Sequence, residues 1–421
     1  MVSDPERTGL LRLTPRERPA FWATFMGWGL DGFDYMLYTL VLATLLTVFK
    51  LTDAQGGLLG TVTLAVSALG GVIAGTVADR VGRVRTLAAA IILYSVFTFL
   101  SGLATSYGML LVFRGFEGLG FGGEWAVGSV LVAETVAARY RGRLLGLVQG
   151  SWAIGWGIAV IASFVILPNL GGLGWRAMFW IGILPAILVF YVLRRVEEPA
   201  VWRERRQEAA TGVSFFRLFN RNVLRTTVFT SILAVGAQSG YYAIFTWLPT
   251  YLKVDRGLSV IGSGPYLLLI ILGSFIGYIL SGYITDALGR KLNFAIFSIC
   301  SGVVILIYTH FQISNGAMLA LSVPLGFFAS GIFSGFGPYL AELFPTSARG
   351  AGQGFAYNFG RGAAAFAPLI VGSMAGTYGL AGAISVFGPA TYLLCIIALL
   401  FLPETKGREL NASAVTNSAR A

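Results

Sequence analysis

Long apolar stretches separated by short polar gaps run through the whole 421-residue chain. A helix needs about 20 mostly apolar residues to cross the hydrocarbon core of a membrane. Twelve stretches reach this length, at residues 20–42, 56–78, 86–105, 108–132, 144–168, 176–193, 225–251, 263–284, 292–311, 316–340, 350–375 and 379–402. The pattern therefore predicts an all-α integral membrane protein with twelve transmembrane helices.

The composition supports this interpretation and argues against a soluble enzyme. Hydrophobic residues make up 56% of the chain and charged residues only 12%, whereas a soluble protein carries about 25% charged residues. The net charge of +11 is spread over the gaps, so we expect no nucleic-acid partner. Cys300, Cys395 and the single His310 stand apart in apolar runs, and we expect neither a metal site nor a disulfide.

Basic residues are divided unequally between the two sets of gaps. The set that includes both chain ends carries 24 of the 30 Lys and Arg residues, and the other set carries four, namely Lys50, Arg176, Lys253 and Arg256. Lys and Arg concentrate in cytoplasmic loops. We therefore expect a multi-pass protein of the plasma (inner) membrane with both termini in the cytoplasm. Residues 1–19 lack an apolar core, so we expect a tail there and no signal peptide.

The longest gap, which is rich in Arg and Glu, separates six helices from six. The predicted organisation is an N-terminal tail (1–19), an N-terminal six-helix bundle (20–193), a cytoplasmic linker (194–224), a C-terminal six-helix bundle (225–402) and a C-terminal tail (403–421).

The two halves repeat one another. Gly75, Asp79, Gly82 and Arg83 recur 207 positions later as Gly282, Asp286, Gly289 and Arg290. Glu134, Arg141, Gly142 and Gly146 recur 208 positions later as Glu342, Arg349, Gly350 and Gly354. A fixed offset of this size indicates two structurally related halves.

The doubled Gly-x-x-x-Asp-x-x-Gly-Arg motif, placed after the second and eighth helices, resembles the signature of the major facilitator superfamily. The resemblance implies two pseudo-symmetric six-helix bundles that transport a solute by alternating access. Such a protein is no enzyme and needs no cofactor beyond an ion gradient. The chain also lacks the Gly-x-x-x-x-Gly-Lys-Ser/Thr loop that binds ATP. Since twelve helices suffice for this fold, we expect a monomer in the lipid bilayer.

The repeated motif predicts a gating latch at the cytoplasmic side. Arg83 can pair with Glu134, and Asp79 can accept N–H bonds at a helix N-terminus. The equivalent residues in the second half are Asp286, Arg290 and Glu342. We expect this latch to hold the outward-open state and to break on inward opening, although a turn that only orients two helices would use the same residues.

Six ionisable residues fall within predicted spans: Asp31, Asp34, Arg114, Glu117, Glu124 and Arg361. Such groups normally face a cavity or a partner. Arg114 and Glu117 are three positions apart and can form a buried ion pair. Because four acids face two arginines, we expect some of the carboxyl groups to bind protons near neutral pH, as proton coupling requires.

The run Asp31-Gly-Phe-Asp34 resembles organic-acid:proton symporters of the sialate and aromatic-acid branches. The run from Arg114 to Trp125, within the predicted helix 108–132, resembles the sialate and metabolite branches. The resemblance implies that Asp31 and Asp34 couple transport to protons, and we add Glu124 to this set. Gly360-Arg361 is similar to the aromatic-acid branch alone, so the substrate stays open within the class of small carboxylates.

Arg361 is the predicted anion site because its planar fork fits a carboxylate and stays charged. An interhelical pair of Arg361 with Asp31, Asp34 or Glu124 is the alternative. Aromatic and amide side chains predicted to complete the substrate site are Tyr357, Asn358, Tyr241, Tyr242, Gln238, Gln149 and Trp152.

These observations predict proton-coupled uptake of a small organic anion. A sugar or other metabolite symporter is the first alternative, followed by a drug/proton antiporter. A membrane-embedded enzyme or a receptor ranks last, and sodium can replace protons because carboxylates bind either cation.

Overall fold

The computed structural model describes residues 13–136, 138–199, 202, 219–345 and 349–407, and these are almost entirely helical. The first group of helices comprises α1 (Glu17–Val48), α2 (Asp53–Val81), α3 (Arg83–Ser101), α4 (Tyr107–Thr135), α5 (Ala138–Asn169), η1 (Gly171–Leu173), α6 (Gly174–Trp180), η2 (Ile181–Ile187) and α7 (Leu188–Arg195). The second group comprises α9 (Arg221–Val254), α10 (Val260–Leu288), α11 (Arg290–His310), α12 (Asn315–Gly331), η4 (Ile332–Gly335), α13 (Phe336–Leu343), α14 (Arg349–Ala364) and α15 (Ala367–Phe401).

Ten helical segments of the described residues are long and apolar enough to cross a membrane. The prediction of twelve differs at two places. The 29-residue helix α4 is not among the ten, and residues 352–401 form one segment of 50 residues where two spans are predicted. Fifty residues would extend about 75 Å as one helix, far more than a bilayer needs, and the chain turns at Gly379 (φ 72°). Twelve crossings therefore stay a prediction.

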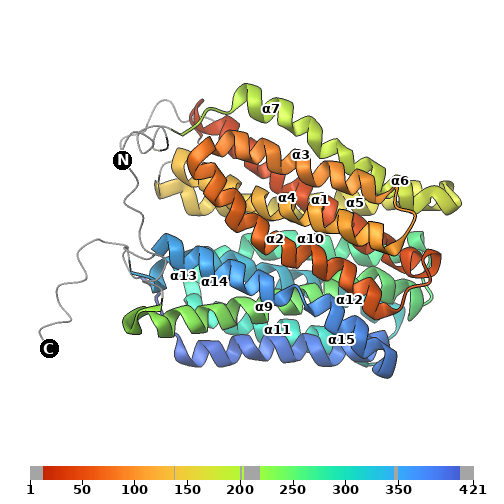
Figure 1. Ribbon diagram of the computed structural model, residues 1–421. Helices are drawn as coiled ribbons and strands as arrows, with labels where there is room; N and C mark the ends of the chain where they lie inside the picture. Colours follow the sequence, from red (N-terminus) through yellow and green to blue (C-terminus); the bar gives the residue numbers. More distant parts are fainter. Residues whose placement is uncertain (1–12, 137, 200–201, 203–218, 346–348, 408–421) are drawn as a thin grey trace, which may run out of the picture.

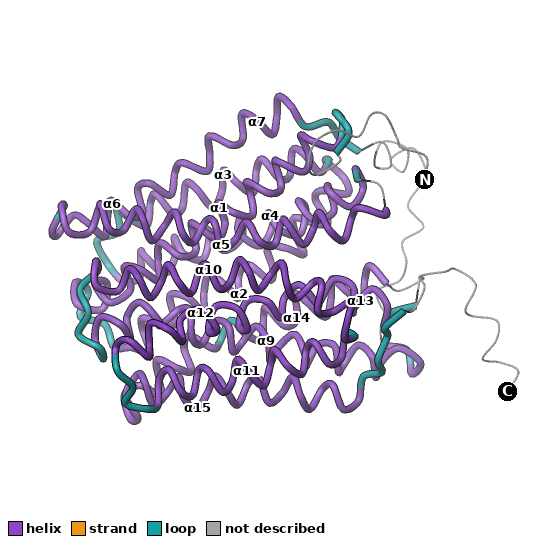
Figure 2. Tube along the Cα trace, turned by 180° about the vertical axis from the view of Figure 1, so that it is seen from behind, coloured by secondary structure: helices purple, strands orange, loops and turns teal. Residues whose placement is uncertain are grey.

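The two groups lie side by side with their long axes roughly aligned, and the described chain starts and ends at the same end of the bundle (Figures 1 and 2). We call this the terminal end and the opposite one the far end. Much of the predicted linker 194–224 and most of both predicted tails lie outside the described residues.

Four helices begin at the far end with a side-chain cap. Thr52 and Gln55 form a capping box on α2, and Ser106, Ser259 and Ser314 accept bonds from the first turns of α4, α10 and α12. These side chains satisfy N–H groups that the helix leaves without partners. The starts of these helices are thus specified locally by hydroxyl residues.

Helix α2 meets the second group along a face that opens toward the terminal end. A Cβ atom added at Gly57 would overlap the carbonyl of Pro368 in α15. Fourteen residues further, at Gly71, it would lie 3.6 Å from Asn358 Oδ1 in α14. At Gly75 on the same face it would meet no atom of the described residues within 4 Å. The two groups are therefore in contact at the far end of α2 and apart at its terminal end.

The α5–α10 interface follows the same course. A Cβ atom at Gly264 would overlap the ring of Phe164 near the far end. At Gly150 it would stand 3.7 Å from the Phe275 ring, and at Gly146 it would meet nothing within 4 Å in the part of the chain that the structure describes. Both interfaces between the two groups thus separate toward the terminal end.

Candidate functional site

The six ionisable residues predicted inside the membrane form two clusters around α1. The Arg361 cluster contains Asp31, Glu124 and Arg361, and the Asp34 cluster contains Asp34, Arg114 and Glu117. All six side chains are at most 2% exposed. Each cluster has two acids and one arginine, so the four-to-two ratio of the sequence is divided into two equal parts.

The Asp34 cluster lies inside the first group of helices. Arg114 Nη1 donates to both carboxylate oxygens of Glu117, at 2.6 and 2.7 Å, which confirms the geometry of the predicted ion pair. The Arg114 guanidinium also stands 4.5 Å from the ring centre of Tyr38. Asp34 interacts with this pair and with Thr98 of α3, and its Oδ1 lies beside Gly182 of η2.

The Arg361 cluster joins the two groups of helices. Asp31 of α1 and Glu124 of α4 both interact electrostatically with Arg361 of α14. Gly27 lets the Glu124 carboxyl lie directly against α1, since a side chain there would overlap it. Neither carboxyl group makes a hydrogen bond within the described part of the chain. Asp31 and Asp34, which both lie on α1, therefore turn toward different neighbours.

Three aromatic rings surround Arg361. Its Cζ lies 5.4 Å from the ring centre of Phe121, and 5.9 Å from those of Trp28 and Tyr357. Aromatic faces stabilise a cation electrostatically while they exclude water. Arg361 Nε is buried and has no hydrogen-bond partner among the described residues. This arrangement leaves a desolvated positive charge with unused hydrogen-bonding capacity.

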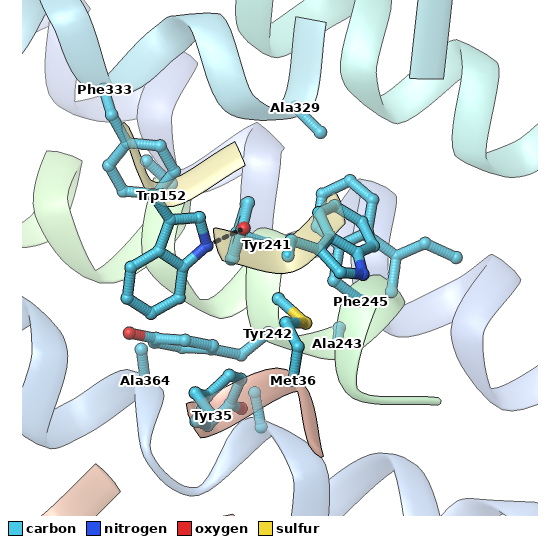
Figure 3. Packing of buried hydrophobic residues seen from close by; sticks show 14 of the residues in the cluster. Tyr35, Met36, Trp152, Tyr241, Tyr242, Ala243, Phe245, Ala329, Phe333 and Ala364 are labelled. Atoms are coloured by element: carbon cyan, nitrogen blue, oxygen red, sulfur yellow. Dashed lines mark hydrogen bonds between the residues drawn. The ribbon is translucent and has the colours of Figure 1, made fainter. Parts of the chain in front are cut away.

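Two hydrogen bonds tie the groups together next to this site. Trp152 Nε1 of α5 donates to the Tyr241 hydroxyl of α9 at 2.9 Å, and the hydroxyls of Tyr35 (α1) and Thr246 (α9) are 2.9 Å apart. Figure 3 shows the first bond, with Tyr242 and Tyr35 below it. Predicted residues Tyr241, Tyr242 and Trp152 are thus brought together at the interface of the two groups.

The predicted amide residues divide into different roles. Gln238 donates to the Tyr357 carbonyl at 2.9 Å and so links α9 to α14. Asn358 donates to the Gly354 carbonyl of its own helix and faces α2. Gln149 keeps a buried carbonyl oxygen without a hydrogen bond in the described region and interacts with Tyr357. Of the three amides, Gln149 is therefore the one with a group available for a ligand.

Sequence reasoning missed several residues of the site. Trp28 and Phe121 pack on Arg361, and the Tyr94 hydroxyl of α3 interacts with Asp31 and Glu124. The spacing of Trp28, Asp31 and Tyr35 at i, i+3 and i+7 is the signal that places Trp28 on the face of Asp31. No sequence spacing predicts the contact of Tyr94 with Asp31 and Glu124, because this contact depends on how α1, α3 and α4 pack.

The repeated motif forms the same ion pair in each half. Arg83 donates from Nε and Nη2 to Glu134 at 3.0 and 3.1 Å, and Arg290 donates likewise to Glu342 at 3.0 and 2.8 Å. Bidentate pairs of this kind fix orientation as well as distance. Asp286 is 76% exposed and stands 3.3 Å from Arg290, and the Asp79 side chain lies outside the described part.

Each ion pair lies within one group of helices, α3 with α4 and α11 with α13. The pairs are formed in a structure whose two groups are apart at the terminal end. Both Arg–Glu pairs are therefore intact in the described arrangement, and each joins two helices of the same group. That the pairs break during transport stays a prediction, as does the alternative that they only orient these helices.

A third repeated element, which the sequence analysis missed, caps both motifs. The carboxylate of Glu198 accepts from the backbone N–H groups of Arg83 and Val84 at 2.8 and 3.0 Å. Glu404 accepts from those of Arg290 and Lys291, both at 3.0 Å. Partial burial alone would raise the pKa of Glu404, but backbone N–H bonds hold it below its usual value, from Arg290, Thr405, Lys291 and Lys406.

The larger described cavity is a different feature from this site. It has a volume of about 330 Å³ and an entirely apolar lining from α1, α5 and η2, which includes Leu30, Ile158 and Leu184. An apolar groove of this kind cannot orient a charged ligand, because it offers no polar partner.

A helical bundle of two groups that meet around buried charges is the architecture of a secondary transporter. The family model of the Major Facilitator Superfamily matches residues 24–321 and 269–419. The chain belongs to this superfamily, whose members are transporters and not enzymes.

Individual relatives agree with this assignment. The chain is 38% identical to a probable 4-methylmuconolactone transporter of Cupriavidus pinatubonensis, over 94% of this chain and 92% of that one. It is 31% identical to a cis,cis-muconate transport protein of Acinetobacter baylyi, over 91% and 94%. Its fold resembles an inward-open structure of the xylose transporter XylE of E. coli, with a TM-score of 0.74 at 19% identity over 93% and 97%.

Proposed function

We propose that this protein takes up a small organic anion together with protons, by alternating access. The observation that carries the proposal is Arg361, a buried guanidinium at the interface of the two groups that interacts with two buried carboxyl groups, Asp31 and Glu124. The guanidinium fork can bind a carboxylate in bidentate fashion and stays charged at any working pH.

Charge balance links anion binding to proton binding. With every group ionised, the Arg361 cluster carries one net negative charge, and a bound carboxylate would add a second in a buried site. Isolated buried charges are very costly. Protonation of Asp31 and Glu124 frees Arg361 for the anion and removes this cost, so the two ligands bind together.

The Asp34 cluster supplies a second site for a proton, separate from the anion. Asp34 competes with Glu117 for the single charge of Arg114, so one of the two acids gains by protonation. In this proposal, protonation of Asp31 and Glu124 is linked directly to anion binding, and protonation of Asp34 provides a further proton for coupled transport. Sodium remains the alternative coupling ion.

The orientation follows from the distribution of basic residues. We propose that the terminal end faces the cytoplasm, because 24 of the 30 Lys and Arg residues belong to the gaps and tails on that side. The protein then resides in the plasma (inner) membrane as a monomer, with 20–193 and 225–402 as its two bundles. The described arrangement is the one open to the cytoplasm, from which the anion and its protons are released.

The names of the relatives favour an acid over a sugar. One is called a cis,cis-muconate transport protein and another a 4-methylmuconolactone transporter, and muconate is a carboxylate. Tyr242 and Tyr357 stand beside Arg361, and Gln149 interacts with Tyr357. These three residues complete the proposed binding site. A neutral sugar would leave the charge of Arg361 unused.

The test uses proteoliposomes that hold a pH dye, in sodium-free buffer. Acids that cross lipid slowly are added singly, namely cis,cis-muconate, shikimate, sialic acid and nicotinate, with xylose as the neutral solute. We expect internal acidification by at least one acid, absent in protein-free liposomes and in Arg361→Ala.

The opposing outcomes are equally clear. A response to xylose and to none of the acids would assign the protein to sugar symport and would return Arg361 to a structural role. Uptake of a radiolabelled acid that follows a sodium gradient, without acidification, would replace the proton as coupling ion.

A further inference from the structure

Trp28 has an indole N–H group without a partner. Its side chain is 4% exposed, and Nε1 makes no hydrogen bond within the described residues. A buried N–H group without an acceptor is costly and rare in folded proteins. Such a group in a binding site points to a ligand that supplies the acceptor.

The surroundings of Trp28 hold its ring in place without using this group. Its ring centre lies 4.3 Å from that of Trp125 and 5.0 Å from that of Trp152. Gly32, one turn further along α1, lets the Trp152 backbone approach the helix closely. The ring is therefore fixed on both sides, while its N–H edge stays available.

A second donor without a partner lies next to it. Arg361 Cζ stands 5.9 Å from the Trp28 ring centre, and Arg361 Nε is also buried and makes no hydrogen bond among the described residues. Trp28 belongs to α1 and Arg361 to α14, so the two donors come from opposite groups of helices. Both groups are donors only, so each requires an acceptor from outside the described residues.

We propose that Trp28 is a substrate-binding residue whose indole N–H donates to the anion held by Arg361. This proposal rests on the proposed function and adds a second contact from the opposite group of helices. A carboxylate can accept from both donors at once, and one that does so bridges the two groups. Trp28 then selects for anions, since a neutral group accepts a weaker hydrogen bond.

The experiment measures binding of the most active acid of the dye assay, by calorimetry on the purified full-length protein. Trp28→Phe keeps an aromatic ring and removes the N–H. We expect its Kd to rise roughly 10- to 100-fold, the range for a hydrogen bond to a charged group. Trp156→Phe is the matched control, because Trp156 Nε1 is also buried without a partner while its ring packs on Phe245 at 5.0 Å.

A double-mutant cycle separates binding from packing. In an Arg361→Lys background we expect Trp28→Phe to have a clearly smaller effect, because the anion no longer sits between the two donors. A wild-type Kd for Trp28→Phe, or equal effects in both backgrounds, would overturn the role of Trp28 and leave anion symport intact. If the wild-type protein gave no acidification with any acid in the dye assay, the proposed function would be overturned, and this inference with it.

Discussion

Arg361 keeps its charge in a setting from which water is excluded by Trp28, Phe121 and Tyr357. The ring faces stabilise the cation, and its Nε makes no hydrogen bond among the described residues. A compact ammonium ion is more strongly hydrated than a guanidinium and presents no fork. The identity of this one side chain therefore decides how well an anion binds.

Arg361→Lys tests this point. We expect anion affinity to fall at least tenfold, about 1.4 kcal/mol, because a lysine loses the bidentate fork and is desolvated at greater cost. Calorimetric Kd values of the purified variant give the answer. Arg256→Lys is the control, since Arg256 binds Ile313 and Asn315 at the far end. Unchanged affinity in Arg361→Lys would contradict the anion site.

The two acids of α1 are expected to differ when each is changed to asparagine. Because ionised Asp31 competes with the anion for Arg361, the Kd of the anion should rise with pH in the wild type. Asp31→Asn should make this rise smaller. Asp34 lies in the other cluster, so Asp34→Asn should keep that rise. It should also abolish gradient-driven accumulation and spare counterflow exchange. Kd values from pH 5 to 8 and uptake assays check both, and identical behaviour would refute the separation into two clusters.

At this scale the sequence predicted which residues matter better than what they contact. Charges in apolar runs identified Asp31, Asp34 and Arg361, because a buried charge needs a specific reason. Asp31 and Asp34 are three positions apart on α1, which corresponds to a 60° difference in direction. That difference is enough to send Asp34 to α3 and η2 while Asp31 faces Arg361.

At the scale of elements, each half contains the same joint between two helices. Gly82 and Gly289 have φ values of 122° and 106°, which favour glycine. The following helix then starts with N–H groups that a glutamate from the end of that half accepts, Glu198 or Glu404. A carboxylate also suits the positive end of a helix dipole.

Glu404→Gln should destabilise the C-terminal half, by about 1 kcal/mol as for the loss of a helix cap. The pKa of Glu404 is lowered in the fold, so its stabilising contribution is complete above the unfolded pKa and is lost as pH falls through the folded value. The melting temperature of the wild type in detergent should therefore drop more steeply between pH 5 and 3 than that of Glu404→Gln.

Asp286→Asn serves as the control for this cap. Asp286 is 76% exposed and forms only a long ion pair with Arg290, and exposed pairs contribute little. Its melting temperature should stay near the wild-type value. Equal acid sensitivity of the wild type and Glu404→Gln would show that Glu404 does not act as a cap.

The sequence predicted the Arg–Glu pairs of this connection but not its glutamate caps. The repeat at an offset of 207 or 208 residues gave the Arg–Glu partners, since repeated halves place equivalent residues in equivalent contacts. Glu198 and Glu404 are 206 residues apart and belong to the same repeat. They escaped notice because they are 115 and 114 residues from the helices they cap, and no local pattern links a cap to a distant helix.

For the whole molecule, the decisive feature is the pair of interfaces that separate toward the terminal end. At the far end Gly57 and Gly264 lie against the other group of helices, and at the terminal end Gly75 and Gly146 do not. If the two bundles rock about a central site, the far end separates and the terminal end comes into contact. Small residues at both ends of one helix face allow each end to close in turn.

Gly57→Trp should prevent closure at the far end, because its side chain would overlap Pro368 of α15. The population should shift toward the state that is closed at the terminal end. The measurement is maleimide labelling of Gly75→Cys, in a background with Cys300→Ser and Cys395→Ser. Labelling should fall severalfold in Gly57→Trp and stay unchanged in Gly108→Trp, whose site has open space. Unaltered labelling in Gly57→Trp would mean that these interfaces do not move together.

The sequence predicted the helices and their grouping, but it gave no information on this conformation. Apolar length and capping residues act within one helix and are visible in the chain. Which end is closed depends on small differences between contacts of two bundles. Residues 352–401 show both kinds of feature. Their turn at Gly379 is local, whereas their contact with α2 depends on how the two bundles pack.

The closed far end also has a consequence for inhibition. In the proposed orientation, the gap beside Gly75 of α2 lies at the end that faces the inside of the cell. A compound shaped to fill that gap must first cross the membrane, and a compound that stays outside meets only the opposite conformation. Pairs of permeant and impermeant analogues of one inhibitor would therefore report which conformation the resting transporter occupies in living cells.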